Sequence, residues 1–404
     1  MNLFRRQLVR NTLLAVVLSV GISETLILQW WLLVSGRPPL GAPAFAGALV
    51  LLLGANFLLL SGMRLLSRRY RQVRVVGHAY MLATLGALLT GPLLVAAFVA
   101  VEFPVWIAGG AGDAAGQRAL GAAGGAAIAV GFASILWGRS FGQRRVAIEK
   151  VRIPMPVLPG PLRGLRIAHL SDLHIGPHLR APRLRSYVDR VSAIDPDLIV
   201  ITGDLFDFDP EYIEEGCREL ARLSARHGVF AILGNHDLYT GADAVAEGLA
   251  KHTGIRLLRD ECVAIEIEDT RLYLLGVDDP GRGWTDRDSE HDAITRLVSE
   301  LPAEVPHLLL AHRPSFFRQA ARLGIPLTLA GHTHGGQIAL PGPGRHLNIS
   351  RLISHWTRGL FREGRSLLYV SRGLGVAGIP VRLNCPREIA LLQLEAGGAT
   401  EAWT

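Results

Sequence analysis

The stretch PLTLAGHTHGG, residues 326–336, is the segment of the sequence that decides the fold. It begins with a short apolar run between Pro326 and Gly331, a pattern that predicts a buried β-strand. The run ends directly in Gly331-His332-Thr333-His334, so two imidazoles follow the predicted strand. In an extended turn, His332 and His334 point to the same side. The segment therefore predicts a strand that presents two histidines at its carboxyl end.

The same arrangement occurs four more times towards the N-terminus. The apolar runs are RIAHL at 166–170, DLIVI at 197–201, VFAIL at 229–233 and HLLLA at 307–311. Polar residues follow each run within a few positions: Asp172 and His174, then Asp204, then Asn235 and His236, then His312. Open α/β sheets place ligands at the carboxyl ends of strands, and imidazole, carboxylate and amide oxygens together suit divalent transition metals. The pattern predicts a metal centre assembled from five strand ends.

Each piece also has a plain structural interpretation. A lone His after a strand is usually a hydrogen-bonded structural residue, and an Asp before a helix is usually a cap. The sequences Gly-Asp and Gly-Asn-His-Asp are common in turns. What favours the metal centre is that every piece stands at the same point relative to its strand, an order that coincidence rarely produces.

With the order Asp-x-His, Gly-Asp, Gly-Asn-His-Asp, His and Gly-His-Thr-His, the chain resembles the calcineurin-like metallophosphoesterases, and among them the bacterial membrane-associated branch. The resemblance runs from about Leu165 to Glu395. It includes GGQ at 335–337, YVSRGLG at 369–375, Arg382 and PREI at 386–389. One position departs from the family pattern, which usually has Glu after the Asn-His pair where this chain has Asp237. That residue is normally not a ligand, so we expect little consequence.

The pattern of apolar residues and the resemblance together predict the fold of this part. Strands alternate with helical stretches at 183–194, 211–226 and 243–252, and this alternation predicts an α/β fold. A second group of strands, around 263–267, 272–277, 367–371 and 389–394, has a hairpin pattern. The resemblance implies a four-layer α-β-β-α sandwich, in which two mixed sheets face each other with helices outside. Periodicity alone does not distinguish this sandwich from a doubly wound sheet.

The resemblance also implies a role for each candidate residue around two metal ions about 3.5–4 Å apart. Asp204 would bridge the two ions. The remaining ligands would be Asp172, His174 and His334 at the first ion, and Asn235, His312 and His332 at the second. His236 would be the general acid that protonates the leaving group, and Asp207 would orient it. A structural histidine at 236 and a helix cap or turn residue at 207 remain the alternatives.

The implied activity is hydrolysis of a phosphate ester with two divalent metal ions. These ligands suit Mn²⁺, iron (Fe²⁺ or Fe³⁺) and Zn²⁺ alike, so the sequence does not identify the metal. A phosphodiester or pyrophosphate is the expected substrate, and a lipid-linked ester is the narrower form of that hypothesis. Two alternatives stay open: a phosphodiesterase of soluble nucleotides with the membrane part only an anchor, and an inactive membrane sensor or scaffold. The net charge of +7 does not indicate nucleic acid, because much of the basic excess flanks apolar segments.

The first third of the chain is apolar enough to enter a membrane. The length of 404 residues favours at least two domains. Hydrophobic residues make up 49% of the chain, which is high for a soluble enzyme, and the excess is concentrated before about residue 138. A bundle of about four transmembrane helices is predicted from apolar stretches of roughly 20 residues each. The stretches are Thr12–Val34, Pro43–Met63, His78–Val101 and Ala119–Trp137. A cleaved signal peptide is the alternative for the first stretch, although no clear cleavage site follows it.

Arginines indicate how this bundle is oriented. They precede the first stretch, gather between Arg64 and Arg74, and follow the fourth stretch from Arg139 to Arg152, whereas the other loops carry little positive charge. Positive loops stay in the cytoplasm. The sequence therefore predicts a multi-pass protein of the inner (cytoplasmic) membrane with its catalytic domain facing the cytoplasm.

These patterns divide the chain into a transmembrane region at 1–138, a basic and Pro-rich linker at 139–164, and a phosphoesterase domain at 165–404. The prolines between 154 and 161 predict a linker that is extended and stiff. The segment Leu340–Gly364 mixes arginines with large apolar side chains, which fits either a membrane-surface segment or an amphipathic helix that covers the core. Glu24 is a carboxylate within the first apolar stretch, where such residues are often functional, but a position near the outer interface or a pairing with a neighbouring helix explains it as well, so no role is assigned to it.

Overall fold

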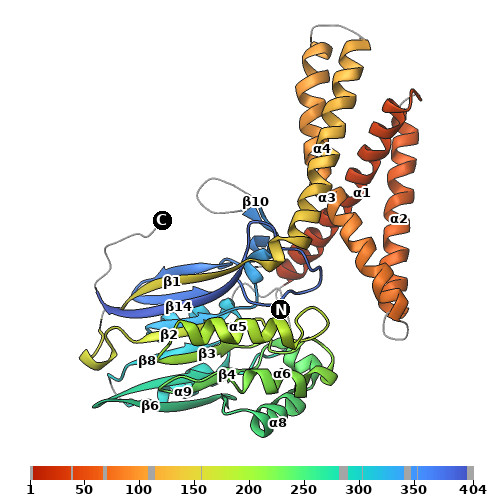
Figure 1. The fold of residues 1–404 in the computed structure, drawn as a ribbon. Coiled ribbons are helices and arrows are strands. Elements are labelled where there is room, and N and C mark those ends of the chain that lie inside the picture. The colour runs from red at the N-terminus through yellow and green to blue at the C-terminus, as the bar shows by residue number, and fades with distance from the viewer. Residues whose placement is uncertain are drawn as a thin grey trace. The chain divides into compact units, whose positions relative to one another are not determined.

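The computed structural model of the protein consists of two compact units, Met1–Ser140 and Phe141–Thr404 (Figure 1). It describes residues 3–37, 40–66, 71–107, 114–155, 157–281, 290–302, 304–340, 347–352 and 354–397. The boundary lies two residues beyond the end predicted for the transmembrane region. Each unit is described by itself below.

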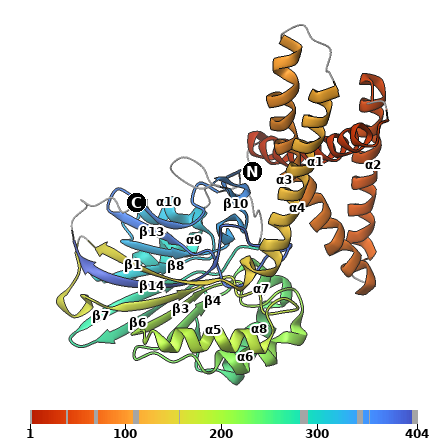
Figure 2. The same ribbon diagram turned by 45° about the horizontal axis from the view of Figure 1, so that its top comes forward.

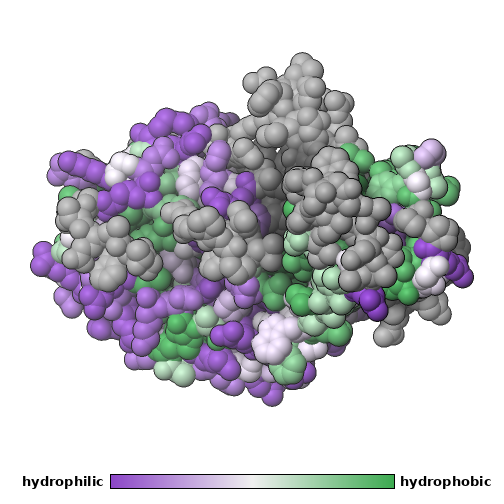
Figure 3. Space-filling model, turned by 90° about the horizontal axis from the view of Figure 1, so that it is seen from above, coloured by the Kyte–Doolittle hydropathy of each residue, from purple (hydrophilic) through white to green (hydrophobic). Residues whose placement is uncertain are grey.

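The first unit contains the helices α1 (Leu3–Val34), α2 (Ala42–Leu66), α3 (Arg71–Ile107) and α4 (Ala114–Ser140). Among the described residues, three segments are long and apolar enough to cross a membrane: Ala42–Leu59, Tyr80–Ala97 and Arg118–Arg144. Leu18–Val34 is a shorter apolar segment, and the side chains before it lie outside the described residues, so a fourth span stays a prediction. Large apolar side chains such as Leu51, Phe57 and Leu136 are exposed on these helices, and Figure 3 shows hydrophobic residues gathered there.

Polar contacts and glycines join the helices of this unit. Asn56 of α2 donates a hydrogen bond of 2.7 Å to Glu24 of α1, which supports the pairing interpretation of Glu24. Trp30 of α1 donates to the carbonyl oxygen of Gly121 at 2.8 Å. A Cβ added at Gly124 would overlap the Trp30 ring, so the glycines of α4 permit close helix packing.

The second unit is built on two six-stranded mixed sheets. The first sheet has the strand order β1 (Val146–Met155), β14 (Arg387–Ala396), β2 (Arg166–Leu170), β3 (Leu198–Thr202), β4 (Val229–Ile232) and β5 (Arg256–Leu257). The second has the order β12 (Gly359–Glu363), β13 (Ser366–Val370), β9 (Leu327–Ala330), β8 (His307–Leu310), β7 (Thr270–Gly276) and β6 (Glu261–Ile267). Strands β2 to β5 run parallel, as do β7, β8, β9 and β13. Carboxyl ends of neighbouring parallel strands therefore meet at one edge of each sheet.

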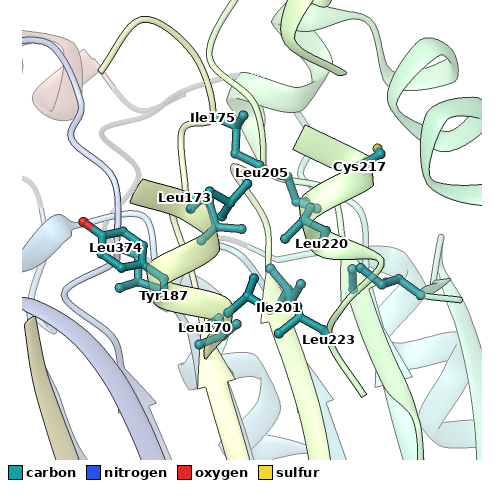
Figure 4. Packing of buried hydrophobic residues seen from close by; sticks show 14 of the residues in the cluster. Leu170, Leu173, Ile175, Tyr187, Ile201, Leu205, Cys217, Leu220, Leu223 and Leu374 are labelled. Carbon is teal, nitrogen blue, oxygen red and sulfur yellow. The ribbon is translucent and has the colours of Figure 1, made fainter. Parts of the chain in front are cut away.

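The two sheets face each other and helices cover their outer faces (Figure 2). In β3, Leu198 and Val200 join the core between the sheets, whereas Ile199 and Ile201 join the outer core, as the alternation of a strand requires. The outer core of the first sheet lies against α5 (Ala181–Ala193), α6 (Ile213–Leu220) and α8 (Ala242–His252), as Figure 4 shows for part of it. On the second sheet α9 (Asp292–Ser299) and α10 (Phe317–Arg322) supply that layer. The predicted α-β-β-α sandwich is confirmed.

The segment expected to be a linker is largely part of the second unit. Residues 146–155 form β1, which pairs in parallel with β14 from Val146 opposite Arg387 to Met155 opposite Ala396. Ile153 and Met155 are buried in the core between the sheets. Pro154 does not prevent this pairing, because β1 is an edge strand and proline is tolerated there. The linker interpretation of 139–164 is thus corrected for these residues.

The described part of the segment 340–364 contains no amphipathic helix, although Trp356 within it covers the core as that alternative expected. Residues 341–346 and 353 lie outside the described part of the chain, Ile349–Leu352 form a 3₁₀ helix, and β12 is an edge strand of the second sheet. Trp356 is only 8% exposed and packs edge-to-face on Phe317, with ring centroids 5.4 Å apart. Pairing of β12 with β13 brings this side chain over the sheet, so Trp356 covers the core and is not a membrane anchor.

Candidate metal centre

The predicted ligands follow the carboxyl ends of five strands, β2, β3 and β4 of the first sheet and β8 and β9 of the second. Several of them have a left-handed backbone, which residues other than glycine rarely adopt. The φ values are 50° at Asp172, 47° at His174, 52° at Asp204, 70° at His332 and 52° at His334. Strained conformations of this kind persist where the surrounding structure holds them, and they concentrate at functional sites.

Glycines in the two motifs allow the loops to approach one another. A Cβ at Gly234 would overlap the carboxylate of Asp204, and one at Gly331 would overlap the side chains of Ser171 and Asp172. The glycine that precedes Asn-His and the glycine that precedes His-Thr-His are therefore required by close packing of the loops against the carboxylates.

The first cluster of ligands consists of Asp172, His174 and His334, each offering one atom within 4.8 Å of the others. The Nε2 atoms of His174 and His334 lie 3.0 Å apart. His334 Nε2 is also 3.4 Å from Asp172 Oδ1. All three side chains are buried.

The second cluster consists of Asp204, His312 and His332, again with one atom of each within 4.8 Å of the others. His332 Nδ1 lies 3.1 Å from His312 Nε2. Asp204 Oδ2 is 3.3 Å from His312 Nε2 and 3.4 Å from His174 Nε2 of the first cluster. One carboxylate oxygen therefore lies between the two clusters, where a bridging ligand belongs.

Backbone and hydroxyl contacts orient these ligands. His312 Nδ1 is 2.8 Å from the carbonyl oxygen of Thr202, so Nδ1 carries a proton and Nε2 is the ring nitrogen that faces His332 and Asp204. Ser171 Oγ donates a hydrogen bond of 2.6 Å to Asp172, and the His332 amide donates to both oxygens of that carboxylate at 3.0 Å. Ligands held in this way need little rearrangement to bind a cation.

The contacts of the donor atoms fit a pair of cations. The oxygen of the Asn235 side chain is buried without a hydrogen-bond partner among the described residues. Buried polar atoms normally have partners, so this oxygen indicates an additional group. Two imidazole pairs face each other at 3.0 and 3.1 Å, and nitrogen and carboxylate donors that converge in this way suit divalent transition metals. Asn235, at the start of α7 (Asn235–Thr240), is itself buried.

His236 and Asp207 form a pair at the edge of the clusters. His236 Nδ1 is 3.0 Å from Asp207 Oδ1, and the His236 amide donates to Asp204 Oδ1 at 2.8 Å. The cap of the following 3₁₀ helix is Asp209, whose side chain accepts from Glu211, so Asp207 is not that cap. Asp207 Oδ1 is also 3.6 Å from Nδ1 of His174.

Neighbouring histidines favour the ionised form of two carboxylates of the site, Asp204 and Asp207, whereas burial raises the pKa of Asp172. Burial alone would raise the pKa of Asp207, but hydrogen bonds and charge from His174 and His236 lower that pKa to about 2. Burial would likewise raise the pKa of Asp204, and the neighbouring His312 holds it well below its usual value. Burial lowers the pKa of His332 to about 3, and the His312 charge adds to this effect. A carboxylate and a neutral imidazole are the forms that bind metal ions.

Asp237 is more important to the structure than its sequence position indicated. Its carboxylate accepts backbone hydrogen bonds from Gly234 at 2.9 Å, from Leu205 at 3.2 Å and from Phe206 at 2.9 Å. It thereby ties the loop that carries Asp204 to the loop that carries Asn235. Burial, with repulsion from Asp204, raises the pKa of Asp237 to about 7. A carboxylate at the third position of a short helix is a capping signal that could have revealed this role.

The segment YVSRGLG, residues 369–375, holds the backbone around Asp172 through hydrogen bonds. The Leu374 amide donates to the Ser171 carbonyl at 3.0 Å, and the Gly375 amide donates to the Asp172 carbonyl at 2.5 Å. Arg382, which is fully buried, donates to the carbonyl oxygens of Arg372, Gly373 and Gly375. These contacts give the segment a structural purpose that spacing alone did not reveal.

Comparison with known proteins finds relatives of this chain. The family profile described as "Calcineurin-like phosphoesterase" matches residues 165–336. An "Uncharacterized metallophosphoesterase" of Aquifex aeolicus is 31% identical over 259 residues, which cover 62% of this chain and 92% of that protein. Proteins described as "Transmembrane protein with metallophosphoesterase domain" are similar in Bos taurus (32% identical, 62% of this chain) and Danio rerio (33% identical, 61% of this chain).

The chain spans 57% of the length of each of these two vertebrate proteins, so the relationship concerns the shared part. The Aquifex aeolicus protein is matched over nearly all of its length. Together with the family profile and the two-sheet fold, these matches identify the chain as a member of the calcineurin-like phosphoesterase family.

Proposed function

We propose that the protein is a membrane-associated hydrolase of phosphate esters that uses two divalent metal ions. The observation that carries the proposal is the position of Asp204 Oδ2, within 3.4 Å of an imidazole nitrogen from each ligand cluster. Two clusters that share one carboxylate are the arrangement that a dinuclear site requires. Family membership supports the same activity.

We assign the predicted ligands to two sets. Asp172, His174 and His334 would hold one ion, His312 and His332 the other together with the buried oxygen of Asn235, and Asp204 both. When bound, the two ions would supply Lewis acidity that activates a water molecule and offsets the charge of the phosphate. The neutral oxygen of Asn235 limits the negative charge that the protein itself brings to the site.

His236 is proposed to protonate the leaving oxygen. Its Nδ1 is occupied by Asp207, so Nε2 is the atom that faces a substrate. The Asp207 carboxylate stabilises the protonated imidazole and holds its orientation. His236 is less buried than the ligand histidines, with 15% of its side chain exposed, which lets a leaving group reach it.

A phosphodiester or pyrophosphate is the proposed substrate, and a lipid-linked ester is its narrower form. Apolar helices in the first unit would keep the enzyme at a membrane, where such a lipid resides. We propose further that this is the inner membrane and that the catalytic unit faces the cytoplasm. The arginines between Arg64 and Arg74 and after α4 support that orientation.

A metal and substrate screen of the full-length protein in detergent tests the proposal. Protein stripped of metal with a chelator is expected to lose hydrolysis of bis(p-nitrophenyl) phosphate, and Mn²⁺, Fe²⁺ or Zn²⁺ to restore it. A parallel comparison of lipid pyrophosphates, soluble diesters and monoesters would rank the substrate classes. Metal binding with no hydrolysis of any ester would overturn the enzymatic proposal in favour of a sensor or scaffold.

A further inference from the structure

Two exposed aromatic side chains lie beside His236, and neither belongs to a metal cluster. Phe208 directly follows Asp207, and Tyr239 lies three residues after His236 on α7. Their ring centroids are 4.5 and 5.7 Å from that of the imidazole. Phe208 is 58% exposed and Tyr239 50%, whereas Phe206, two residues earlier, is fully buried. The aromatic pair is therefore a surface feature of the site and not part of the core.

The backbone holds Phe208 in a conformation that bulky residues rarely adopt. Its φ is 55°, and the Asp209 amide donates to the Asp207 carbonyl at 2.7 Å, which closes a three-residue turn around Phe208. The same turn presents Asp207 to Nδ1 of His236 and places the Phe208 ring beside that imidazole, with the two ring planes tilted by 59°. Local strain that positions two groups on one functional side chain indicates a role at the site.

The two rings lie parallel to each other and offset, since their planes differ by 3° and their centroids are 5.7 Å apart. Each ring is at least half exposed and offers a flat apolar face. A planar ring gains most from a flat surface, because aromatic groups stack in this offset arrangement. An acyl chain has no such preference for a flat partner, and it leaves water fully only where a groove encloses it on several sides.

We propose that Phe208 and Tyr239 bind the leaving group of the substrate and favour an alcohol that carries a planar aromatic or heteroaromatic ring. The proposal rests on the proposed function, because it needs His236 to meet the leaving oxygen. That oxygen approaches Nε2, and the next atoms of the alcohol then reach the rings that flank the imidazole. A benzyl group and a nucleoside both have the chemistry that fits.

A matched pair of diesters tests this preference in the full-length, Mn²⁺-loaded protein. Dibenzyl phosphate and bis(cyclohexylmethyl) phosphate have six-membered rings at the same distance from phosphorus, and only the benzyl rings are planar. Both diesters are symmetric, so the identity of the leaving alcohol is not in doubt. Dioctyl phosphate supplies a third arm, in which the leaving group is a flexible chain.

The wild-type protein is expected to show a higher kcat/KM for dibenzyl phosphate than for the cyclohexylmethyl ester. Replacing either ring, in Phe208→Leu or Tyr239→Leu, should reduce kcat/KM for dibenzyl phosphate by about 5- to 100-fold, the usual value of one stacking contact, and bring the ratio of the two diesters towards one. The conservative changes Phe208→Tyr and Tyr239→Phe should retain the ratio.

Tyr273→Leu is the matched control for an aromatic residue that the proposal does not involve. Tyr273 lies on β7 opposite His307, at the end of β8 away from His312, and it is expected to leave the ratio unchanged. Equal losses for both diesters in the Phe208 and Tyr239 variants would overturn the proposal, because they would show that the rings only position His236. A wild-type preference for dioctyl phosphate that these variants abolish would overturn it in favour of an acyl-chain site.

A binding measurement separates this inference from the proposed function. Calorimetry with benzylphosphonate and cyclohexylmethylphosphonate, which are not hydrolysed, needs no turnover. Tighter binding of the benzyl compound that disappears in Phe208→Leu supports the aromatic surface even if no ester is hydrolysed. If the enzyme hydrolyses diesters but binds the two phosphonates equally, the preference for a planar ring is contradicted and the proposed function is unaffected.

Discussion

The two halves of the candidate metal centre each contain a pair of histidines, but different contacts support them. In the first half, Asp172 is held by the hydroxyl of Ser171 and by the segment 371–375, which arrives late in the chain. In the second half, His312 is held by the carbonyl of Thr202, and the Asp204 loop is held by Asp237. The imidazole pairs are nonetheless equally close, at 3.0 and 3.1 Å.

Because their supports differ, the two halves should respond differently to substitution. Thr202 ends β3 and His312 follows β8, so the second half joins the two sheets directly through a backbone carbonyl that no substitution removes. The first half depends on the Ser171 hydroxyl, on backbone amides that bond Asp172, and on glycines that leave room for this residue. Substitutions near the first half should therefore loosen one metal site selectively, whereas a change at the shared carboxylate should affect both.

Asp204→Asn is expected to have the largest effect, because it removes the charge that both halves share. The amide keeps the size of the side chain and the acceptor for the His236 amide, so the change tests charge more than shape. Hydrolysis should fall by more than about 100-fold, and metal analysis should show loss of one or both ions. Asp189→Asn, at an exposed ion pair with Arg222, is the control. Wild-type metal content with wild-type turnover would contradict a bridging role.

His236→Ala should leave both halves loaded and remove the proton donor. Turnover is expected to fall by roughly 10²–10⁴-fold for alkyl diesters and by less for p-nitrophenyl esters, whose leaving groups need no proton. Steady-state kinetics on the two ester types, with metal analysis alongside, measure the effect. A similar loss for both ester types would argue that His236 supports the metal site instead.

Gly373→Ala is expected to weaken the first half alone. The added methyl would lie 2.7 Å from Asp172 Cβ at a backbone φ of 70°. Calorimetric titration of the metal-free protein with Mn²⁺ should show about 10- to 100-fold weaker binding at one site and little change at the other. Gly364→Ala is the matched control, because φ there is 61° and nothing lies within 4 Å of the added methyl. If Gly364→Ala weakens Mn²⁺ binding as much as Gly373→Ala does, backbone strain and not the close approach to Asp172 explains the loss of affinity.

Ser171→Ala should have the smallest effect, since it removes one hydrogen bond to Asp172 and leaves the amide of His332 in place. We expect Mn²⁺ affinity at the first site to fall by up to about ten-fold, with the second site unchanged. Ser186→Ala, at an exposed hydroxyl that bonds within its own helix, is the control for the loss of a serine. A larger loss of Mn²⁺ affinity at the second site would contradict the claim that Ser171 supports only the first half.

Some features of the protein follow from local sequence alone. Apolar runs such as 198–201 and 327–330 are short, rich in aliphatic residues and bounded by turn residues, so they can be identified as strands without knowledge of their neighbours. Asp204, His312 and His332 each follow such a run, and the predicted metal centre rests on that local order. The apolar stretches within α2, α3 and α4 are local in the same sense, because length and hydropathy define them.

The tertiary structure alone decided how distant segments pair. His174 lies against His334, 160 positions later, and β1 lies against β14 at the other end of the chain. The prolines around β1 indicated a linker because nothing local reveals a partner strand. The sequence left the segment that contains Trp356 open between a membrane-surface role and cover for the core, and its packing on Phe317 favours the cover. The hydrogen bonds of Asp237 and the stacking of Phe208 on Tyr239 arise where loops of different strands meet at one edge, and contacts of that kind depend on packing and not on periodicity.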